Sequence, residues 1–251
     1  MTRVASLFRC AALCGAALCG CTEASSDRAF TPLESHVDDS GQNSALSFDG
    51  VDDYASTGTA QFPDGRSTQT LSLWFMAGSV AGKQALLTLR KDFDSGVEVG
   101  LNDGHVTAWR VYGNRSLLAA KTTIDPGTWH HVAYTFDQTN NGLYLDGALI
   151  ASSDGAPDKR TPTTCWIGTL DGTADLFQGR IDQLRIFDVV LAPEQIAADA
   201  AGQATADGSV PVLDLPFDER GGSVVFDHSP LANDGQLGEG IAERMPARVA
   251  R

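Results

Sequence analysis

Gly-Thr-Trp-His-His-Val-Ala-Tyr-Thr-Phe-Asp occupies residues 127–137, and Gly-Leu-Tyr-Leu-Asp-Gly follows at residues 142–147. The first segment is rich in aromatic and β-branched side chains, which favour strands. The second ends in Asp-Gly, a strong signal for a tight turn, and an apolar segment begins directly after it at Ala148. This part of the chain therefore predicts short strands joined by tight turns.

The same pattern continues on both sides of this stretch. The further predicted strands are residues 45–48, 71–76, 84–90, 97–101, 105–112, 166–168 and 179–187. The 26 glycines and 10 prolines indicate many turns between them. A single short helix is predicted at residues 192–201, because Pro193 lies near its start and Gly202 follows its end. Many short strands with regular turns predict an all-β sandwich or barrel.

Taken in order, these segments resemble the laminin-G-like jelly-roll domains of the concanavalin A-like lectin/glucanase superfamily. The resemblance covers about residues 43–200. It rests on segments 45–54, 71–75, 127–137, 142–147, 166–168, 179–187 and 191–196. It implies a two-sheet antiparallel β-sandwich with one short helix on its C-terminal side, within a domain that we place at residues 43–251.

The tail at residues 211–240 resembles the strand and loop that normally precede the first of these segments, at residues 45–54. Either it begins a truncated second copy of the domain, or it supplies an edge strand to the same sandwich. About 40 residues are too few for an independent core. We therefore expect the tail to complete the one domain.

The N-terminus has the features of an export signal. Residues 10–20 carry no charge and follow two arginines, but they are too short to span a bilayer comfortably. The sequence Leu18-Cys19-Gly20-Cys21 resembles the lipobox of bacterial lipoproteins. That resemblance implies a signal peptide at residues 1–20 and a lipid on Cys21, and the alternative is a secretory signal without lipid. The polar residues 21–42 predict a flexible tether.

These features predict an exported protein that is lipid-anchored to the bacterial cell envelope. Where the cell has an outer membrane, Thr22 after the lipidated cysteine favours that membrane, by resemblance to sorted lipoproteins. Charge excludes other partners: 18 basic against 32 acidic residues give a net charge of −14. Phosphates of nucleic acid and anionic lipid headgroups would be repelled, so we expect no nucleic acid and membrane contact through the anchor only.

Four of the five cysteines lie within the first 21 residues, which leaves Cys165 alone in the body of the chain. A disulfide framework needs paired cysteines, so none is predicted. Cys165 lies in an apolar strand and is expected to be a buried thiol that packs as a small hydrophobic side chain.

Oxygen-rich loops are the predicted metal site. Asp182 together with one or more of Asp49, Asp52 and Asp227 would supply carboxylate ligands to a structural calcium, which takes six to eight oxygens. Family members often hold one structural calcium in this region. Aspartates are also ordinary turn residues, and the sequence leaves both interpretations open.

A ligand-binding face is predicted around the turn at residues 102–105. Asn102, His105 and nearby Trp109 combine an aromatic ring with polar groups, which suits a sugar. Trp74 and Trp129 lie inside apolar runs instead. We expect both of these indoles to fill the space between the two sheets.

Catalytic motifs are missing from the sequence. Glucanases of the same superfamily carry clustered carboxylates on one strand, whereas Asp182 has no glutamate two or three residues away. Serine-elbow, cysteine–histidine and zinc signatures are absent as well. The sequence thus predicts a non-catalytic, surface-anchored module that binds carbohydrate or an extracellular or cell-envelope protein. The alternative is a structural or adhesion scaffold, and a glucanase-type enzyme ranks below both.

Overall fold

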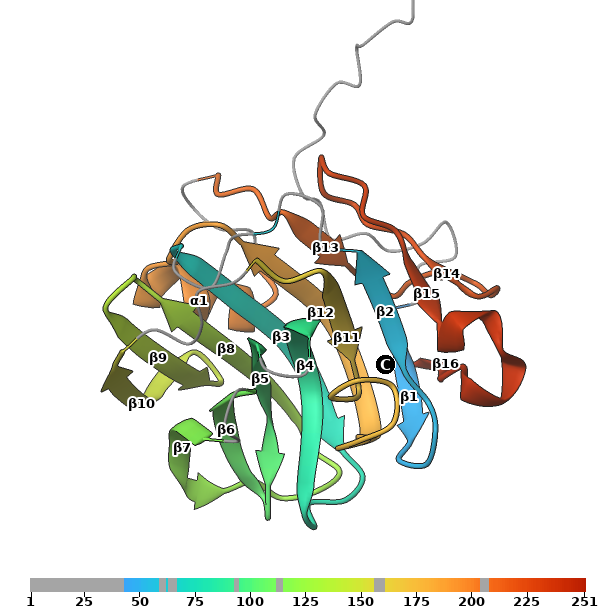
Figure 1. The fold of residues 1–251 in the computed structure, drawn as a ribbon, viewed down its shortest axis with the longest axis horizontal. Coiled ribbons are helices and arrows are strands. Elements are labelled where there is room, and N and C mark those ends of the chain that lie inside the picture. The colour runs from blue at the N-terminus through green and yellow to red at the C-terminus, as the bar shows by residue number, and fades with distance from the viewer. Residues whose placement is uncertain are drawn as a thin grey trace, which may run out of the picture. The chain divides into compact units, whose positions relative to one another are not determined.

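The computed structural model describes residues 43–58, 62, 67–92, 95–111, 115–155, 161–203 and 208–251. The predicted signal peptide, the lipidation site Cys21 and the tether up to residue 42 lie outside the described residues. The described part of the chain forms two facing antiparallel sheets with one α-helix, so the predicted fold class is confirmed (Figure 1).

Sheet A has the strand order β10-β9-β8-β3-β12-β1-β16, with β13 also paired to β12. Its strands are β1 (Ser44–Asp49), β3 (Gln69–Ala77), β8 (Trp129–Phe136), β9 (Asn140–Leu145), β10 (Ala148–Asp154), β12 (Gln178–Phe187), β13 (Leu213–Leu215) and β16 (Ala247–Ala250). β8 contains most of the aromatic-rich stretch at residues 127–137, and it lies between β9 and the central strand β3.

Sheet B has the order β14-β15-β2-β11-β4-β5-β6-β7. Its strands are β2 (Ala55–Gly58), β4 (Lys83–Asp92), β5 (Ser95–Asn102), β6 (His105–Arg110), β7 (Arg115–Thr123), β11 (Thr164–Ile167), β14 (Val224–Val225) and β15 (Gly235–Leu237). The turn between β5 and β6 places Asp103 and Gly104 at positive φ, as the Asn-Asp-Gly sequence requires.

The hydrophobic core lies between the sheets. Side chains of a strand alternate between its two faces, so every second residue points inward. Sheet A contributes Leu71, Leu73, Phe75, Val132, Tyr134, Phe136, Leu46 and Ile181 to the core, and sheet B contributes Leu87, Leu89, Val97, Val99, Leu101, Val106, Ala108 and Ile167. Cys165 is fully buried among them, and burial raises the pKa of its thiol.

The tail adds strands to both sheets. β13 pairs with β12, β15 pairs with β2, and β16 pairs with β1. The red segments of Figure 1 accordingly lie beside the blue strands β1 and β2. The pairing of β16 extends beyond residues 211–240, the range given to the tail from the sequence.

The helix α1 (Pro193–Ala200) matches the predicted helix to within one residue at each end. Ile196 packs with Leu191 and Phe187 against the outer face of sheet A. Asp199, at the inner side of the helix, accepts hydrogen bonds from Ser72 Oγ at 2.7 Å and His131 Nε2 at 3.1 Å. Arg185 also pairs with this carboxylate. These contacts hold the pKa of Asp199 at about 2, because they more than offset the effect of burial.

None of the helices in the described part of the chain has the length and apolar character needed to cross a membrane.

Candidate functional site

The three residues predicted to bind a ligand share one face of sheet B. Asn102 on β5 is directly opposite His105 on β6, and Trp109 lies four residues further along β6. Residues four apart on a strand point the same way. The intervening Val106 and Ala108 belong to the core, so Asn102, His105 and Trp109 lie on the outer face of the sheet.

Trp109 is half-buried on this face. Its indole Nε1 donates to Thr107 Oγ1 at 2.8 Å, which fixes the orientation of the ring. The Nζ of Lys83, on β4, lies 5.0 Å from the ring centroid, a cation–π contact. His105 Nδ1 lies 3.0 Å from the carbonyl oxygen of Ala120. The face thus holds an oriented aromatic ring with polar groups around it.

A charged cluster adjoins Trp109. Lys83 Nζ lies 2.9 Å from Glu98 Oε2 and 2.6 Å from Asp175 Oδ2. Glu98 is directly opposite Trp109 on β5, and its side chain is only 1% exposed. Burial raises the pKa of Glu98, although the attraction of Lys83 opposes this. Burial lowers the pKa of Lys83, but attraction to Glu98 and Asp175 more than offsets it, so the pKa is raised.

The loop at residues 168–177, between β11 and β12, supplies further contacts on the same face. Asp171 Oδ2 pairs with Arg90 Nη1 at 3.0 Å, and the carbonyl oxygen of Thr169 accepts from Thr88 Oγ1 at 3.1 Å. Next to this loop the half-buried indole of Trp166 meets the ring of Tyr54 edge to face, with centroids 5.6 Å apart. An aromatic pair thus lies on the same face as Trp109.

Lys83, Glu98 and Arg90 were not predicted from the sequence. A signal for Glu98 was present, because a glutamate between two inward valines must point outward. The pairs Lys83–Asp175 and Arg90–Asp171 had no such signal, since each aspartate lies more than 80 residues further along the chain than its partner.

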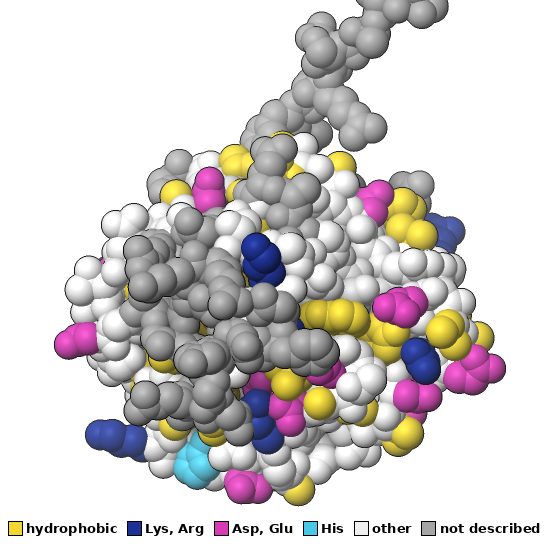
Figure 2. Space-filling model, viewed as in Figure 1, with side chains coloured by type: hydrophobic (Ala, Val, Ile, Leu, Met, Phe, Trp, Pro, Cys, Tyr) yellow, Lys and Arg dark blue, Asp and Glu magenta, His cyan; other side chains and the backbone are white. Residues whose placement is uncertain are grey.

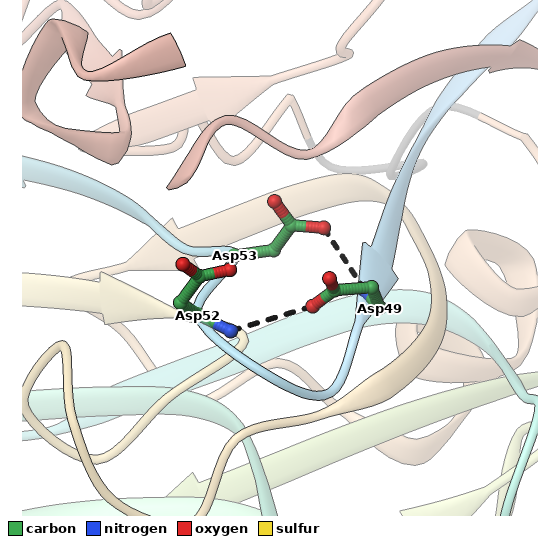
Figure 3. A group of neighbouring side chains, drawn as sticks. All are labelled: Asp49, Asp52 and Asp53. Atoms are coloured by element: carbon green, nitrogen blue, oxygen red, sulfur yellow. Dashed lines mark hydrogen bonds between the residues drawn. The ribbon is translucent and has the colours of Figure 1, made fainter. Parts of the chain in front are cut away.

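The acidic loop after β1 holds the candidate cation ligands. Asp49, Asp52 and Asp53 can place one carboxylate oxygen each within 4.8 Å of one another (Figure 3). Asp49 Oδ1 accepts from the backbone N–H of Val51 at 2.7 Å, and Asp53 Oδ2 accepts from that of Asp49 at 2.9 Å. Burial raises the pKa of Asp53, and the charges of Asp49 and Asp52 add to this. Three hard oxygen donors fit a calcium ion, and the hydrogen bonds also fit turn chemistry.

The other two predicted metal ligands lie elsewhere. Ile181 pairs with Leu46, so the next residue, Asp182, lies level with residue 45 of β1. Asp49 is four residues further along β1, which places the two aspartates about 13 Å apart along the sheet at 3.3 Å per residue. Asp182 Oδ2 pairs instead with Arg251. The predicted set of four is therefore corrected: the structure brings Asp49 and Asp52 together with Asp53, without Asp182.

Asp227 serves the tail. Its Oδ1 accepts from the backbone N–H groups of Asp214 and Ser229, at 2.9 and 2.8 Å, and its Oδ2 accepts from that of Asn233 at 2.8 Å. The carboxylate of Asp227 therefore organises the turn between β14 and β15 and lies apart from the Asp49 loop.

The expectation for Trp74 and Trp129 is wrong. Both indoles are half-buried on the outer face of sheet A, where Trp74 is opposite His131 and Trp129 is opposite Met76. The inward positions of β3 belong to Leu73 and Phe75. Residues 71–76 are almost entirely apolar, so alternation could not tell which set faces the core.

Acidic side chains are scattered over the face shown in Figure 2 and do not gather in one patch. This distribution accords with the net charge of −14. The candidate ligand face of sheet B is thus distinguished by its aromatic rings and its paired charges, and not by a patch of negative charge.

Comparisons with known proteins agree with this architecture. A family model described as "Concanavalin A-like lectin/glucanases superfamily", of the laminin-G type, matches residues 49–197. A rat protein with sushi, von Willebrand factor type A, EGF and pentraxin domains is 29% identical over 106 residues, which are 37% of this chain and 3% of that protein. The chain thus spans only a small fraction of the length of this curated relative.

Two solved structures share the fold. A protein from Bacteroides ovatus, described as a candidate carbohydrate-binding protein, has a TM-score of 0.63 at 15% identity, over 83% of this chain and 60% of that one. The sialidase module CBM40 of Ruminococcus gnavus, bound to α2,3-sialyllactose, has a TM-score of 0.51 at 16% identity, over 62% of this chain and 96% of that one. With the family match covering more than half of the sequence, the chain belongs to the laminin-G-like family of the concanavalin A-like lectin/glucanase superfamily.

Proposed function

We propose that this protein is a non-catalytic binding module that takes carbohydrate on the outer face of sheet B, around Trp109. The observation that carries the proposal is the oriented, half-buried indole of Trp109 with Asn102 and His105 on the same face. A sugar ring offers an apolar face for stacking and hydroxyls for hydrogen bonding, and binding sites combine these two features. Fold neighbours that are carbohydrate-binding modules support the same class of ligand.

The charged cluster supports binding over catalysis. A retaining glycosidase needs two carboxyl groups about 5–5.5 Å apart that can both reach the scissile bond. Glu98 and Asp175 share Lys83, but the side chain of Glu98 is 1% exposed and therefore out of reach of a substrate. The ion pairs position Lys83 over Trp109 and hold the loop at residues 168–177 against the sheet.

For the acidic loop we propose a structural calcium ion, held by Asp49, Asp52 and Asp53 with further oxygens from water or backbone. The ion would offset the mutual repulsion of three carboxylates within 4.8 Å. Its role would be to rigidify the loop between β1 and β2, and it would not contact the bound ligand.

For the location of the protein we propose export and attachment to the cell envelope through a lipid on Cys21, on the basis of the lipobox-like sequence alone. The partner would then be a surface glycan, or, in the alternative function, a cell-surface protein held by an adhesion scaffold.

Glycan-array binding followed by calorimetry on the full chain tests the proposal, with Cys21→Ser introduced so that no lipid is attached. Saturable binding of a glycan that is lost in Trp109→Ala supports it. Absence of glycan binding, with a stable complex formed with an envelope protein instead, would favour the scaffold.

A further inference from the structure

The side chain of Arg251 is bound on the outer face of sheet A by two indoles and a carboxylate. Its guanidinium carbon lies 4.7 Å from the ring centroid of Trp74 and 4.9 Å from that of Trp129. Its Nη1 lies 2.9 Å from Asp182 Oδ2. One cation thus contacts two aromatic rings and an anion at once.

Three neighbouring strands build this arrangement. Trp129 comes from β8, Trp74 from the adjacent β3, and Asp182 from β12, where it is directly opposite Trp74. All three side chains belong to the outward set of their strands. The ring of Trp74 also meets the ring of His131 edge to face at 5.5 Å, which limits the movement of the indole. The three side chains that contact Arg251 therefore belong to the rigid centre of the sheet.

The carboxylate is unusually placed for a surface-facing residue. Asp182 is 0% exposed, so water does not solvate its charge. The contact with Arg251 is an ion pair that lacks hydrogen-bond geometry, and Oδ2 has no hydrogen-bond partner among the described residues. The charged form of a buried carboxylate is costly without a partner, so a cation bound at this position stabilises it.

The occupant, by contrast, follows a short strand at the edge of the sheet. Arg251 follows β16, a four-residue strand at the edge whose residues are all exposed or half-buried. Among the described strands β16 pairs only with β1, the backbone N–H of Arg251 donates to the carbonyl oxygen of Asn43, and Arg248 pairs with Glu219. Short exposed edges open at low free-energy cost. The site formed by Trp74, Trp129 and Asp182 is thus fixed in the sheet, while the arginine that fills it can be exchanged.

We propose that Trp74, Trp129 and Asp182 form a guanidinium-binding site, which Arg251 fills within the chain and which an arginine side chain of a partner protein fills when β16 withdraws. A planar, delocalised cation suits this site because it stacks on both rings while it pairs with the carboxylate. Withdrawal of β16 would also free the edge of β1, so an extended partner segment could pair there. This site lies on the opposite sheet from Trp109 and does not depend on carbohydrate binding.

The test uses the full chain with Arg251→Ala and methylguanidinium as the probe, with the neutral isostere N-methylurea as the comparison. We expect methylguanidinium to change the tryptophan fluorescence of this variant saturably and to raise its unfolding midpoint by about 3 °C at saturating concentration. The wild type and Lys121→Ala should show neither response, because Arg251 still fills the site in both. Lys121 is an exposed basic residue on β7, away from β16, so its loss is the matched control.

Adding Asp182→Asn to Arg251→Ala should abolish the response to methylguanidinium. An equal response from the wild type and Arg251→Ala, or from methylguanidinium and N-methylurea, overturns the proposal and leaves Arg251 as a structural latch. Arg251→Gln keeps a side chain of similar length without charge and gives the same test if the alanine variant does not fold.

Discussion

Glu98 and Trp109 are directly opposite each other on β5 and β6, and Lys83 contacts both, as an ion pair with the carboxylate and as a cation over the indole. The buried carboxylate therefore fixes the lysine, and the lysine covers part of the aromatic ring. A half-buried indole that is held in this way loses little side-chain entropy when a ligand stacks on it.

We expect Trp109→Ala to weaken glycan affinity at least about tenfold, equivalent to about 1.4 kcal/mol, because truncation removes the stacking surface. Calorimetry with the glycan selected on the array measures the change. Trp74→Ala removes a half-buried indole from the other sheet and should leave the affinity unchanged. Equal losses in the two variants would show that the effect is one of folding and not of contact.

Lys83→Met should lower the free energy of unfolding at pH 8 by about 2 kcal/mol, because Glu98 loses its cation in a buried position. The loss should be smaller at pH 4, where the raised pKa of Glu98 lets it take up a proton. Urea unfolding measures both, with Lys121→Met on an exposed position as the control. Glu98→Gln in the same chain should recover most of the loss, and failure to recover it would contradict the ion-pair account.

Calcium at about 1 mM should raise the unfolding midpoint relative to a chelator, because an ion bound only by the folded chain stabilises it. Asp52→Asn should lose this effect, whereas Asp182→Asn should keep it, since Asp182 lies away from the acidic loop. A midpoint that does not respond to calcium would assign Asp49, Asp52 and Asp53 to turn chemistry alone.

The stability of the protein should fall between pH 4 and pH 8 partly because of Asp182, whose pKa is raised to about 7 by burial despite the attraction of Arg251 and Arg185. The nearby charge of Asp218 adds to the rise. The folded chain holds this proton more tightly than the unfolded chain, whose carboxyl has a pKa near 3.8. The stabilisation is therefore full below about pH 4 and is lost as the pH rises through 7.

Asp182→Asn removes this dependence. Relative to the wild type it should be equally stable at pH 4 and more stable at pH 8, by a few kcal/mol, since one pKa unit corresponds to about 1.4 kcal/mol. Urea unfolding across this pH range gives the comparison, with the exposed Asp188→Asn as the matched control. A difference between Asp182→Asn and the wild type that stays constant with pH would contradict the assignment.

Local sequence carries most of the fold. Residues 97–101 alternate strictly and form a strand whose Val97, Val99 and Leu101 lie in the core, and Pro193 and Gly202 bracketed α1 to within one residue. Which face of β3 points to the core could not be predicted in this way, because an almost uniformly apolar strand has no alternation and Trp74 could point either way. Its outward position depends on the register with β8 and β12, which no local pattern contains.

The same limit applies to the candidate sites. Asn102, His105 and Trp109 belong to one hairpin, so their common face followed from the turn between them. Asp175, which pairs with Lys83, and Arg251, which pairs with Asp182, come from segments more than 60 residues away from their partners, and only the packed sheets bring them together. The acidic loop was predicted because its aspartates are neighbours in sequence. The prediction that Asp182 joins them was wrong, because the register between β1 and β12 could not be known from the sequence.

The pairing of β1 on both sides has a mechanical consequence. Ser44 begins β1 opposite Ala250 of β16, and β12 flanks β1 on its other edge. A pull applied at Ser44 along the strand loads the hydrogen bonds to both neighbours in shear, so they must break together and not one after another. Because β12 pairs with β1 over Leu46–Asp49, the entry point at residues 43 and 44 keeps this resistance to shear even where β16 withdraws.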